Sequence, residues 1–174
     1  MLFIKIKPLL ILYKSIFQLD MKIYDCFQFF DEEMLLELRL NILDKYVDKF
    51  VISEASYMHN GKPKKLNFDI NNFSKFKHKI TYIIVNDPPP NLTEIHVNET
   101  QKSKQAKKIS NAYKRHIYQL DKVKDGLTNA EPDDIIIVGD LDEIPNLEDI
   151  NFDNIKNKLI FFKQKMFYYK LNLF

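Results

Sequence analysis

The run Ile135-Ile-Ile-Val138 constrains the fold more than any other feature of this 174-residue chain. Four consecutive β-branched residues favour a strand, and no polar side chain interrupts them. A strand that is apolar on both faces is typical of the middle of a parallel sheet, where helices cover both faces. The run therefore predicts an α/β domain in which residues 135–138 are buried on both sides.

The rest of the chain alternates strand and helix patterns, as an open α/β sheet requires. Short apolar runs at residues 22–28, 50–52 and 79–85 predict three further strands. Apolar residues at helical spacing predict two helices, one after the first strand that runs to about Tyr46, and one over about residues 103–124. The fold class is thus α/β, with an open, mainly parallel sheet flanked by helices.

Each predicted helix is expected to bury one apolar face. For the first helix, the inward residues are expected to be Leu35, Leu36, Leu38, Leu40, Ile42, Leu43 and Val47. For the second helix, they are expected to be Ile109, Tyr113, Ile117, Leu120 and Val123.

Composition excludes several classes of site. The three glycines form neither a G-x-G-x-x-G nor a Walker A motif, and the chain has no G-x-S-x-G or H-E-x-x-H sequence. The single Cys26 cannot make an intrachain disulfide or a thiolate zinc site. A net charge of +2 argues against a general polyanion binder. The remaining chemistry must be carried by carboxylates.

Acidic residues are concentrated at the end of the last predicted strand. Between Asp125 and Asp153 there are ten acids and no base, and most of them are expected to be solvated. Asp140 and Asp142 differ because they directly follow the strand, and open parallel sheets bind ligands at the carboxyl ends of their strands. Crowded carboxylates repel one another unless a cation joins them. Because Mn²⁺ and Mg²⁺ bind carboxylate and phosphate oxygens together, this D-x-D sequence predicts a divalent metal site.

The segment before this cluster carries the opposite charge. Between Gln101 and Lys124 there are eight bases and one acid. The lysines are expected to be solvated, whereas the guanidinium of Arg115 suits bidentate contact with phosphate. Nucleic-acid binding through Lys102 to Lys108 is an alternative whose signature would be a strong salt dependence. The four histidines show no ligand spacing and are expected on the surface or in loops.

Several segments resemble glycosyltransferase family 17, the β-1,4-mannosyl-glycoprotein β-1,4-N-acetylglucosaminyltransferase family. In order along the chain they are Tyr24–Glu32, Leu38–Asn41, Val47–Glu54, His59–Lys64 and Asp133–Pro145. The resemblance runs from about Met21 to the C-terminus. It implies a GT-A fold and the transfer of N-acetylglucosamine from UDP-GlcNAc to a glycan acceptor, with inversion and with Mn²⁺ or Mg²⁺ as cofactor.

The resemblance also implies site residues, although it provides no general base. The donor-binding residues that it implies are Asp31, Glu32, Glu54, Arg115 and Asp140, and the metal-binding residues are Asp140 and Asp142. Asp31 stands where the family usually has Asn, and Gly139 stands where Ser is common.

The two ends of the chain carry separate expectations. Residues 1–20 are expected to be a peripheral apolar arm or a stretch upstream of a true start at Met21, and the second is preferred because the first strand pattern follows at once. The longest uncharged stretch, Pro8 to Tyr13, is too short for a membrane span, and no signal-peptide cleavage site follows it. A cytoplasmic location is therefore expected. Residues 21–174 are expected to form a nucleotide-sugar-binding domain that lacks the family's C-terminal acceptor region.

Two alternatives to a complete glycosyltransferase stay open. One is a truncated, catalytically inactive remnant that binds the nucleotide sugar without transferring it. The other is a phosphatase of the D-x-D-x-T type, which is disfavoured because that motif follows the first strand, whereas Asp140 follows about the fourth. The sequence assigns neither the acceptor nor the oligomeric state.

Overall fold

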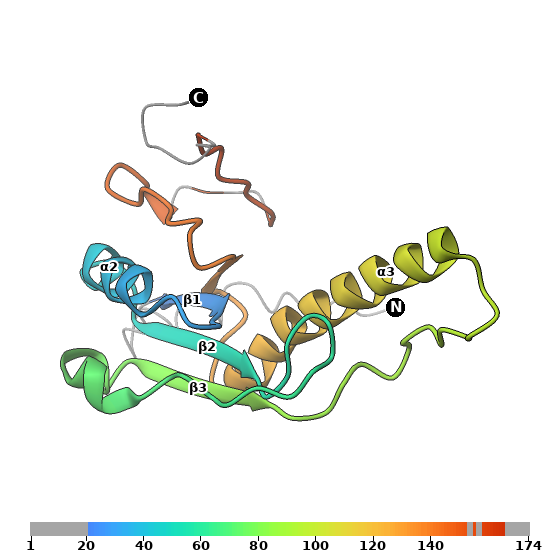
Figure 1. Cartoon of the computed structure of the whole chain (residues 1–174). Coiled ribbons are helices and arrows are strands. Elements are labelled where there is room, and N and C mark those ends of the chain that lie inside the picture. The colour runs from blue at the N-terminus through green and yellow to red at the C-terminus, as the bar shows by residue number, and fades with distance from the viewer. Residues whose placement is uncertain (1–20, 153–154, 156–157, 166–174) are drawn as a thin grey trace, which may run out of the picture.

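The chain forms one parallel sheet in the part that the structure, a computed structural model, describes: residues 21–152, 155 and 158–165. The expectations for residues 1–20 lie outside this part. The strands are β1 (Ile23–Gln28), β2 (Lys49–Ala55), β3 (Ile80–Val85) and β4 (Ile135–Gly139). Their order in the sheet is β3-β2-β1-β4, and all three neighbouring pairs are parallel (Figure 1). The predicted α/β class is confirmed.

Helical segments connect the strands. They are α2 (Glu33–Leu43), η1 (Ile70–Phe76), α3 (Gln101–Asp121) and η2 (Lys122–Gly126). Each connection returns the chain to the end of the sheet at which the strands begin, so the strands can pair in parallel. Among the described residues, no helix is long and apolar enough to span a membrane.

The core has two parts because alternate strand residues point to opposite faces of the sheet. On the α2 face, strand residues such as Phe27 and Ile52 pack with Leu36 and Leu40 of α2, and all four are fully buried. The smaller cluster on the other face contains Tyr24, Cys26, Val51 and Val123. Burial raises the pKa of the Cys26 thiol to about 12, so this cysteine acts as an apolar core residue.

The strand β4 corrects the prediction that residues 135–138 are buried on both faces. Ile137 is buried, but Ile136 and Val138 are 38% and 52% exposed. Since β4 lies at one end of the strand order, the described residues cover only one of its faces. The β-branched run predicted the strand correctly and its position in the sheet wrongly.

The buried face of α2 is rotated from the predicted one, and the helix ends at Leu43 rather than near Tyr46. Leu38 and Ile42 are exposed, whereas Arg39, which no hydrophobic pattern would select, is fully buried. The buried side chain of Arg39 shifts the face that α2 turns toward the sheet.

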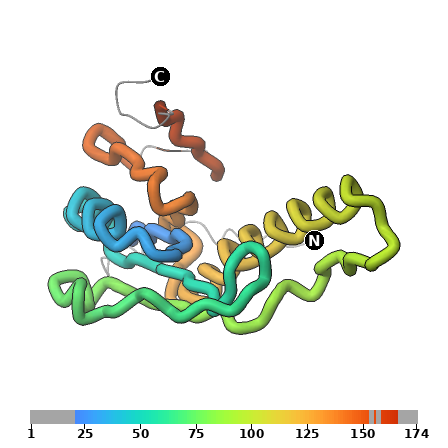
Figure 2. Tube along the Cα trace, in the orientation of Figure 1, coloured from blue at the N-terminus to red at the C-terminus, as the bar shows by residue number. Residues whose placement is uncertain are grey.

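The helix α3 also differs from its prediction, because Ile109, Tyr113 and Ile117 are exposed. Figure 2 shows the reason: residues 86–100 run outward from the end of β3, and the amino-terminal half of α3 returns beside them, beyond the sheet. The side chain of Asn111 exchanges two hydrogen bonds with the backbone of Thr93, at 2.8 and 2.7 Å.

Three lysines of α3 hold the outgoing segment, residues 86–100, rather than remaining free in solvent. Lys104 donates to the carbonyl of Val97, Lys107 to that of Glu94, and Lys114 to that of Asn91. The cluster that suggested nucleic-acid binding is therefore partly used in folding.

Candidate functional site

The acidic loop, residues 140–143, begins directly after β4. The backbone N–H of Asp140 donates to a carboxylate oxygen of Glu143 at 3.1 Å, and the N–H of Glu143 donates back to the carbonyl of Asp140 at 3.0 Å. Leu141 is buried in the core. Leu141 thus anchors the loop in the core, and the carboxylates of Asp140 and Asp142 lie at the surface.

A buried ion pair lies beneath this loop. Arg39 of α2 and Asp25 of β1 are both 0% exposed, and the guanidinium contacts the two carboxylate oxygens at 2.8 and 2.9 Å. The third nitrogen, Nη1, donates to the carbonyls of Asp140, Leu141 and Glu143, at 2.8, 3.0 and 3.2 Å. This pair joins α2, β1 and the acidic loop.

Gln28 and His116 contact the Asp140 carboxylate from two other elements. Gln28 ends β1 and donates from Nε2 to Asp140 Oδ1 at 2.9 Å, and the same nitrogen lies 2.8 Å from His116 Nδ1. The Gln28 Oε1 atom is buried and has no hydrogen-bond partner among the described residues. This unpaired acceptor belongs to a side chain that holds the Asp140 carboxylate.

These groups line a cavity of about 340 Å³ at the carboxyl ends of the strands. Its lining residues are Gln28, Phe29, Phe30, Glu32, Leu35, His59, His116, Gln119, Asp140, Leu141 and Asp142. Three of the predicted site residues, Glu32, Asp140 and Asp142, therefore border one pocket. The volume is within the range of small-molecule sites.

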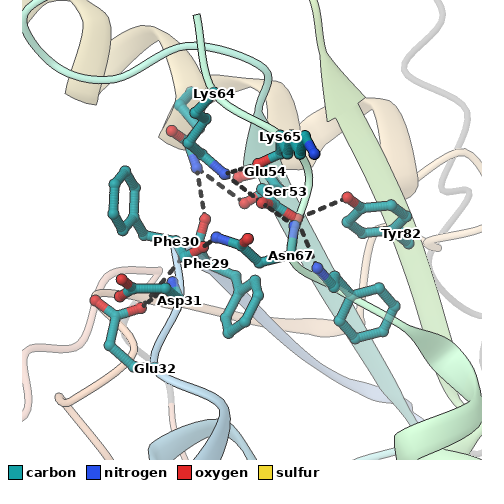
Figure 3. Close-up of polar contacts among 12 residues, drawn as sticks. Phe29, Phe30, Asp31, Glu32, Ser53, Glu54, Lys64, Lys65, Asn67 and Tyr82 are labelled. Carbon is teal, nitrogen blue, oxygen red and sulfur yellow. Dashed lines mark hydrogen bonds and ion pairs between the residues drawn. The ribbon is translucent and has the colours of Figure 1, made fainter.

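The basic loop, residues 56–68, follows β2 and is organised by Glu54 (Figure 3). The carboxylate of Glu54 is fully buried and accepts hydrogen bonds from the backbone N–H groups of Asn67 and Phe68, at 2.8 and 3.1 Å. Lys64 forms an ion pair with it, and the hydroxyl of Tyr82 donates to it at 2.8 Å. This predicted donor-binding residue does not line the pocket; it contacts protein groups that shape the basic loop.

Glu32 and Asp31, the two predicted donor-binding residues that follow β1, have different surroundings. Glu32 accepts hydrogen bonds from the backbone N–H groups of Phe30 and Asp31, at 3.2 and 3.1 Å, which closes the turn between β1 and α2. Its neighbour Asp31 is exposed and lies outside the pocket lining.

Arg115 reaches the site through the basic loop. Its guanidinium donates to the carbonyl of His59 at 3.0 Å and packs against Gly61, where a Cβ atom would lie only 2.7 Å from Nη2. Gly61 has a φ of +85°, which favours glycine. Arg115 thus positions the turn that carries His59 into the pocket.

His59 and His116 pack edge to face, with ring centroids 5.7 Å apart. Burial and the nearby His116 ring lower the pKa of His59 below its usual value, against the opposing effect of Asp140. Both histidines were predicted to be surface or loop residues, and the structure places both in the pocket wall. His59 does lie in a loop, but His116 is on α3.

The residues that the sequence did not reveal are Arg39, Asp25, Gln28 and the two histidines. Asp25 and Gln28 lie on a predicted strand, and the position of Gln28 at its carboxyl end is a signal that could have selected it. Arg39 and its partner are fourteen positions apart, so no local pattern indicates the pair.

The described residues form an α/β domain with a pocket and two carboxylates at the carboxyl ends of its parallel strands, where open sheets of this class commonly bind ligands. The model of glycosyltransferase family 17 matches residues 13–172. The chain therefore belongs to glycosyltransferase family 17, which confirms the resemblance seen in its motifs.

Three mammalian relatives support this assignment. The chain is 30% identical over 122 residues to the beta-1,4-mannosyl-glycoprotein 4-beta-N-acetylglucosaminyltransferases of Homo sapiens, Rattus norvegicus and Mus musculus. The match covers 68% of this chain but 21% of the human protein and 20% of the other two, so the chain spans about a fifth of their length. No solved structure matches the chain significantly.

Proposed function

We propose that this chain is the donor-binding part of a metal-dependent glycosyltransferase that moves N-acetylglucosamine from UDP-GlcNAc to a glycan hydroxyl with inversion. The observation that carries the proposal is the placement of Asp140 and Asp142 in one pocket at the carboxyl ends of parallel strands. N-acetylglucosamine is proposed as the transferred sugar because the relatives are named as N-acetylglucosaminyltransferases. A GT-A fold agrees with the four parallel strands.

The carboxylates fit a divalent metal. Asp140 Oδ1 accepts a hydrogen bond from Gln28, whereas its second oxygen and both oxygens of Asp142 accept none from the described residues. No group of three or more metal-binding side chains occurs in the described part of the chain. Asp140 and Asp142 would therefore hold Mn²⁺ or Mg²⁺ together with phosphate oxygens of the donor. When bound, the metal would neutralise the diphosphate leaving group.

Other pocket residues would orient the donor. Gln28 would orient the Asp140 carboxylate through its Nε2 hydrogen bond, and the rings of Phe30 and His59 would exclude water from one side of the pocket. Glu54 and Arg115 would act on the basic loop that shapes the site, through the contacts described above. Preorganised groups of this kind favour the charge that develops on the leaving phosphate.

A donor comparison tests the proposal. Binding of UDP-GlcNAc, UDP-glucose and GDP-mannose is measured with Mn²⁺, and UDP release is then followed with a mannose-containing glycan acceptor. The proposal predicts preferential binding of UDP-GlcNAc and acceptor-dependent UDP release. Binding without release would instead support the inactive donor-binding remnant, and preference for GDP-mannose would contradict the proposed donor.

A further inference from the structure

The guanidinium of Arg39 has more partners than are needed to neutralise Asp25. Nε and Nη2 form the two-point contact with the carboxylate, at 2.9 and 2.8 Å. Nη1 is left for the acidic loop and donates to three of its four carbonyl groups. The buried Nη1 protons also require acceptors, and the acceptors that they find are carbonyl groups of the acidic loop.

These contacts fix the direction of the loop backbone. The carbonyls of Asp140, Leu141 and Glu143 all accept from one nitrogen atom, so their peptide groups turn toward the core. Leu141 packs in the same core, and Asp140 and Asp142 line the pocket beside it. The guanidinium also lies 4.6 Å from the ring centroid of Phe27, which restricts its own movement.

We infer that Arg39 is a positioning residue that holds the carboxylates of Asp140 and Asp142 in the arrangement needed for a divalent metal and a nucleoside diphosphate. The inference rests on the proposed function for the identity of the ligand. Because Asp25 balances the charge of Arg39, the effect is geometric rather than a long-range electrostatic one. Groups that orient metal ligands commonly change metal affinity about 10- to 100-fold when they are removed.

The decisive variant removes both buried charges. In Asp25→Leu/Arg39→Met no unpaired charge remains in the core, and apolar replacement of a whole buried pair is often tolerated. Arg39→Lys is a second variant that keeps a charge opposite Asp25, but a single ammonium cannot reproduce the fork that reaches both partners. Circular dichroism checks folding for both.

Lys79→Met is the matched control. Lys79 also donates to two backbone carbonyls, those of Asp44 and Val47, and forms an ion pair with Asp44 at 3.0 Å. It lies just before β3, at the opposite end of the sheet from the acidic loop. This variant therefore removes similar contacts without touching the pocket.

Two measurements are made on each full-length variant: calorimetric titration of UDP with Mn²⁺, and hydrogen exchange of the amides of Glu143 and Ile144, which donate to the carbonyls of Asp140 and Asp142. The double variant and Arg39→Lys are expected to weaken Mn²⁺-dependent UDP binding at least about tenfold. Both are also expected to exchange these two amides at least about tenfold faster, whereas Lys79→Met should change neither property. Wild-type binding and exchange in a folded Arg39→Lys or double variant would overturn the inference. If the wild-type chain itself binds no UDP, the proposed function fails, and the exchange rates alone decide whether Arg39 holds the loop.

Discussion

Two loops border the pocket, and each is joined to the core by one buried charge. The acidic loop turns carbonyl groups toward the guanidinium of Arg39, whereas the basic loop turns the N–H groups of Asn67 and Phe68 toward the carboxylate of Glu54. The buried charge has the opposite sign to the side chains that each loop carries. Asp140 and Asp142 belong to the first loop, and Lys64 belongs to the second.

This comparison shows how a small sheet can shape charged loops around a pocket. A buried cation requires acceptors and a buried anion requires donors, so each charge selects the backbone groups that turn inward. The carboxylates of Asp140 and Asp142 are then left for a ligand, because the loop is held through its backbone. The two loops differ in the partner of the buried charge. Glu54 forms its ion pair with Lys64 of the basic loop, whereas Arg39 forms its ion pair with Asp25 of β1, outside the acidic loop.

The largest expected loss of stability comes from removing one member of the Arg39–Asp25 ion pair and leaving the other buried. Arg39→Met leaves the Asp25 carboxylate buried without its partner, and we expect a loss of roughly 3 to 5 kcal/mol in the free energy of unfolding. Urea denaturation measures it. Asp25→Leu/Arg39→Met should recover much of this loss, and a double variant no more stable than the single one would contradict the charge-pair explanation.

The equivalent change in the basic loop should cost less. Glu54→Gln keeps the shape and an acceptor oxygen but removes the charge opposite Lys64, so we expect a loss of about 2 to 3 kcal/mol by urea denaturation. Tyr82→Phe removes one neutral donor to the same carboxylate and serves as the smaller control, with a loss of about 1 kcal/mol. Equal losses in the two variants would argue that the charge of Glu54 does not organise the loop.

Gly61→Ala tests the turn that presents His59. Its φ of +85° disfavours a side chain by about 1 to 2 kcal/mol, and the new Cβ would also crowd Arg115. Thermal denaturation should show a lower Tm. In an Arg115→Ala background the same substitution should cost less, because only the backbone preference remains; an unchanged cost would show that the guanidinium does not crowd this position.

The smallest effect concerns pH. The pKa of His59 is lower in the folded chain than in the unfolded chain, so the unfolded state binds more protons as the pH falls. The contribution of His59 to stability is therefore fully present above pH 6.5 and is lost as the pH falls through the folded-state pKa. Urea denaturation of the metal-free chain at pH 7.5 and 5.5 measures this, and His59→Gln should reduce the difference. An unchanged difference would assign the pH dependence to other groups.

Local sequence patterns predicted the elements better than their environments. The β-branched run located β4, and the position of Asp140 directly after it placed the acidic loop at the pocket. The exposure of Val138 was not predictable, because it depends on the position of β4 in the strand order. Likewise, the burial of Arg39 depends on Asp25, which is brought next to it only by folding.

Resemblance and geometry also contributed differently to the site. The family motifs selected Glu32, Asp140 and Asp142, which line one pocket. They gave Glu54 and Arg115 as donor-binding residues without showing that both hold the basic loop. The histidines escaped prediction because His59 and His116 are far apart in sequence and meet only where α3 passes this loop.

Calorimetric titration of UDP into the full chain, with Mn²⁺ and then with EDTA, tests the central claim most directly. The wild-type chain and Asp149→Ala, which changes an exposed acid outside the pocket, should bind UDP with Mn²⁺ and lose binding with EDTA. Asp142→Ala should remain folded and show no Mn²⁺-dependent binding. Unchanged binding in Asp142→Ala, or a folded wild-type chain that binds no UDP with Mn²⁺, would contradict the assignment of the acidic loop as the metal and donor site.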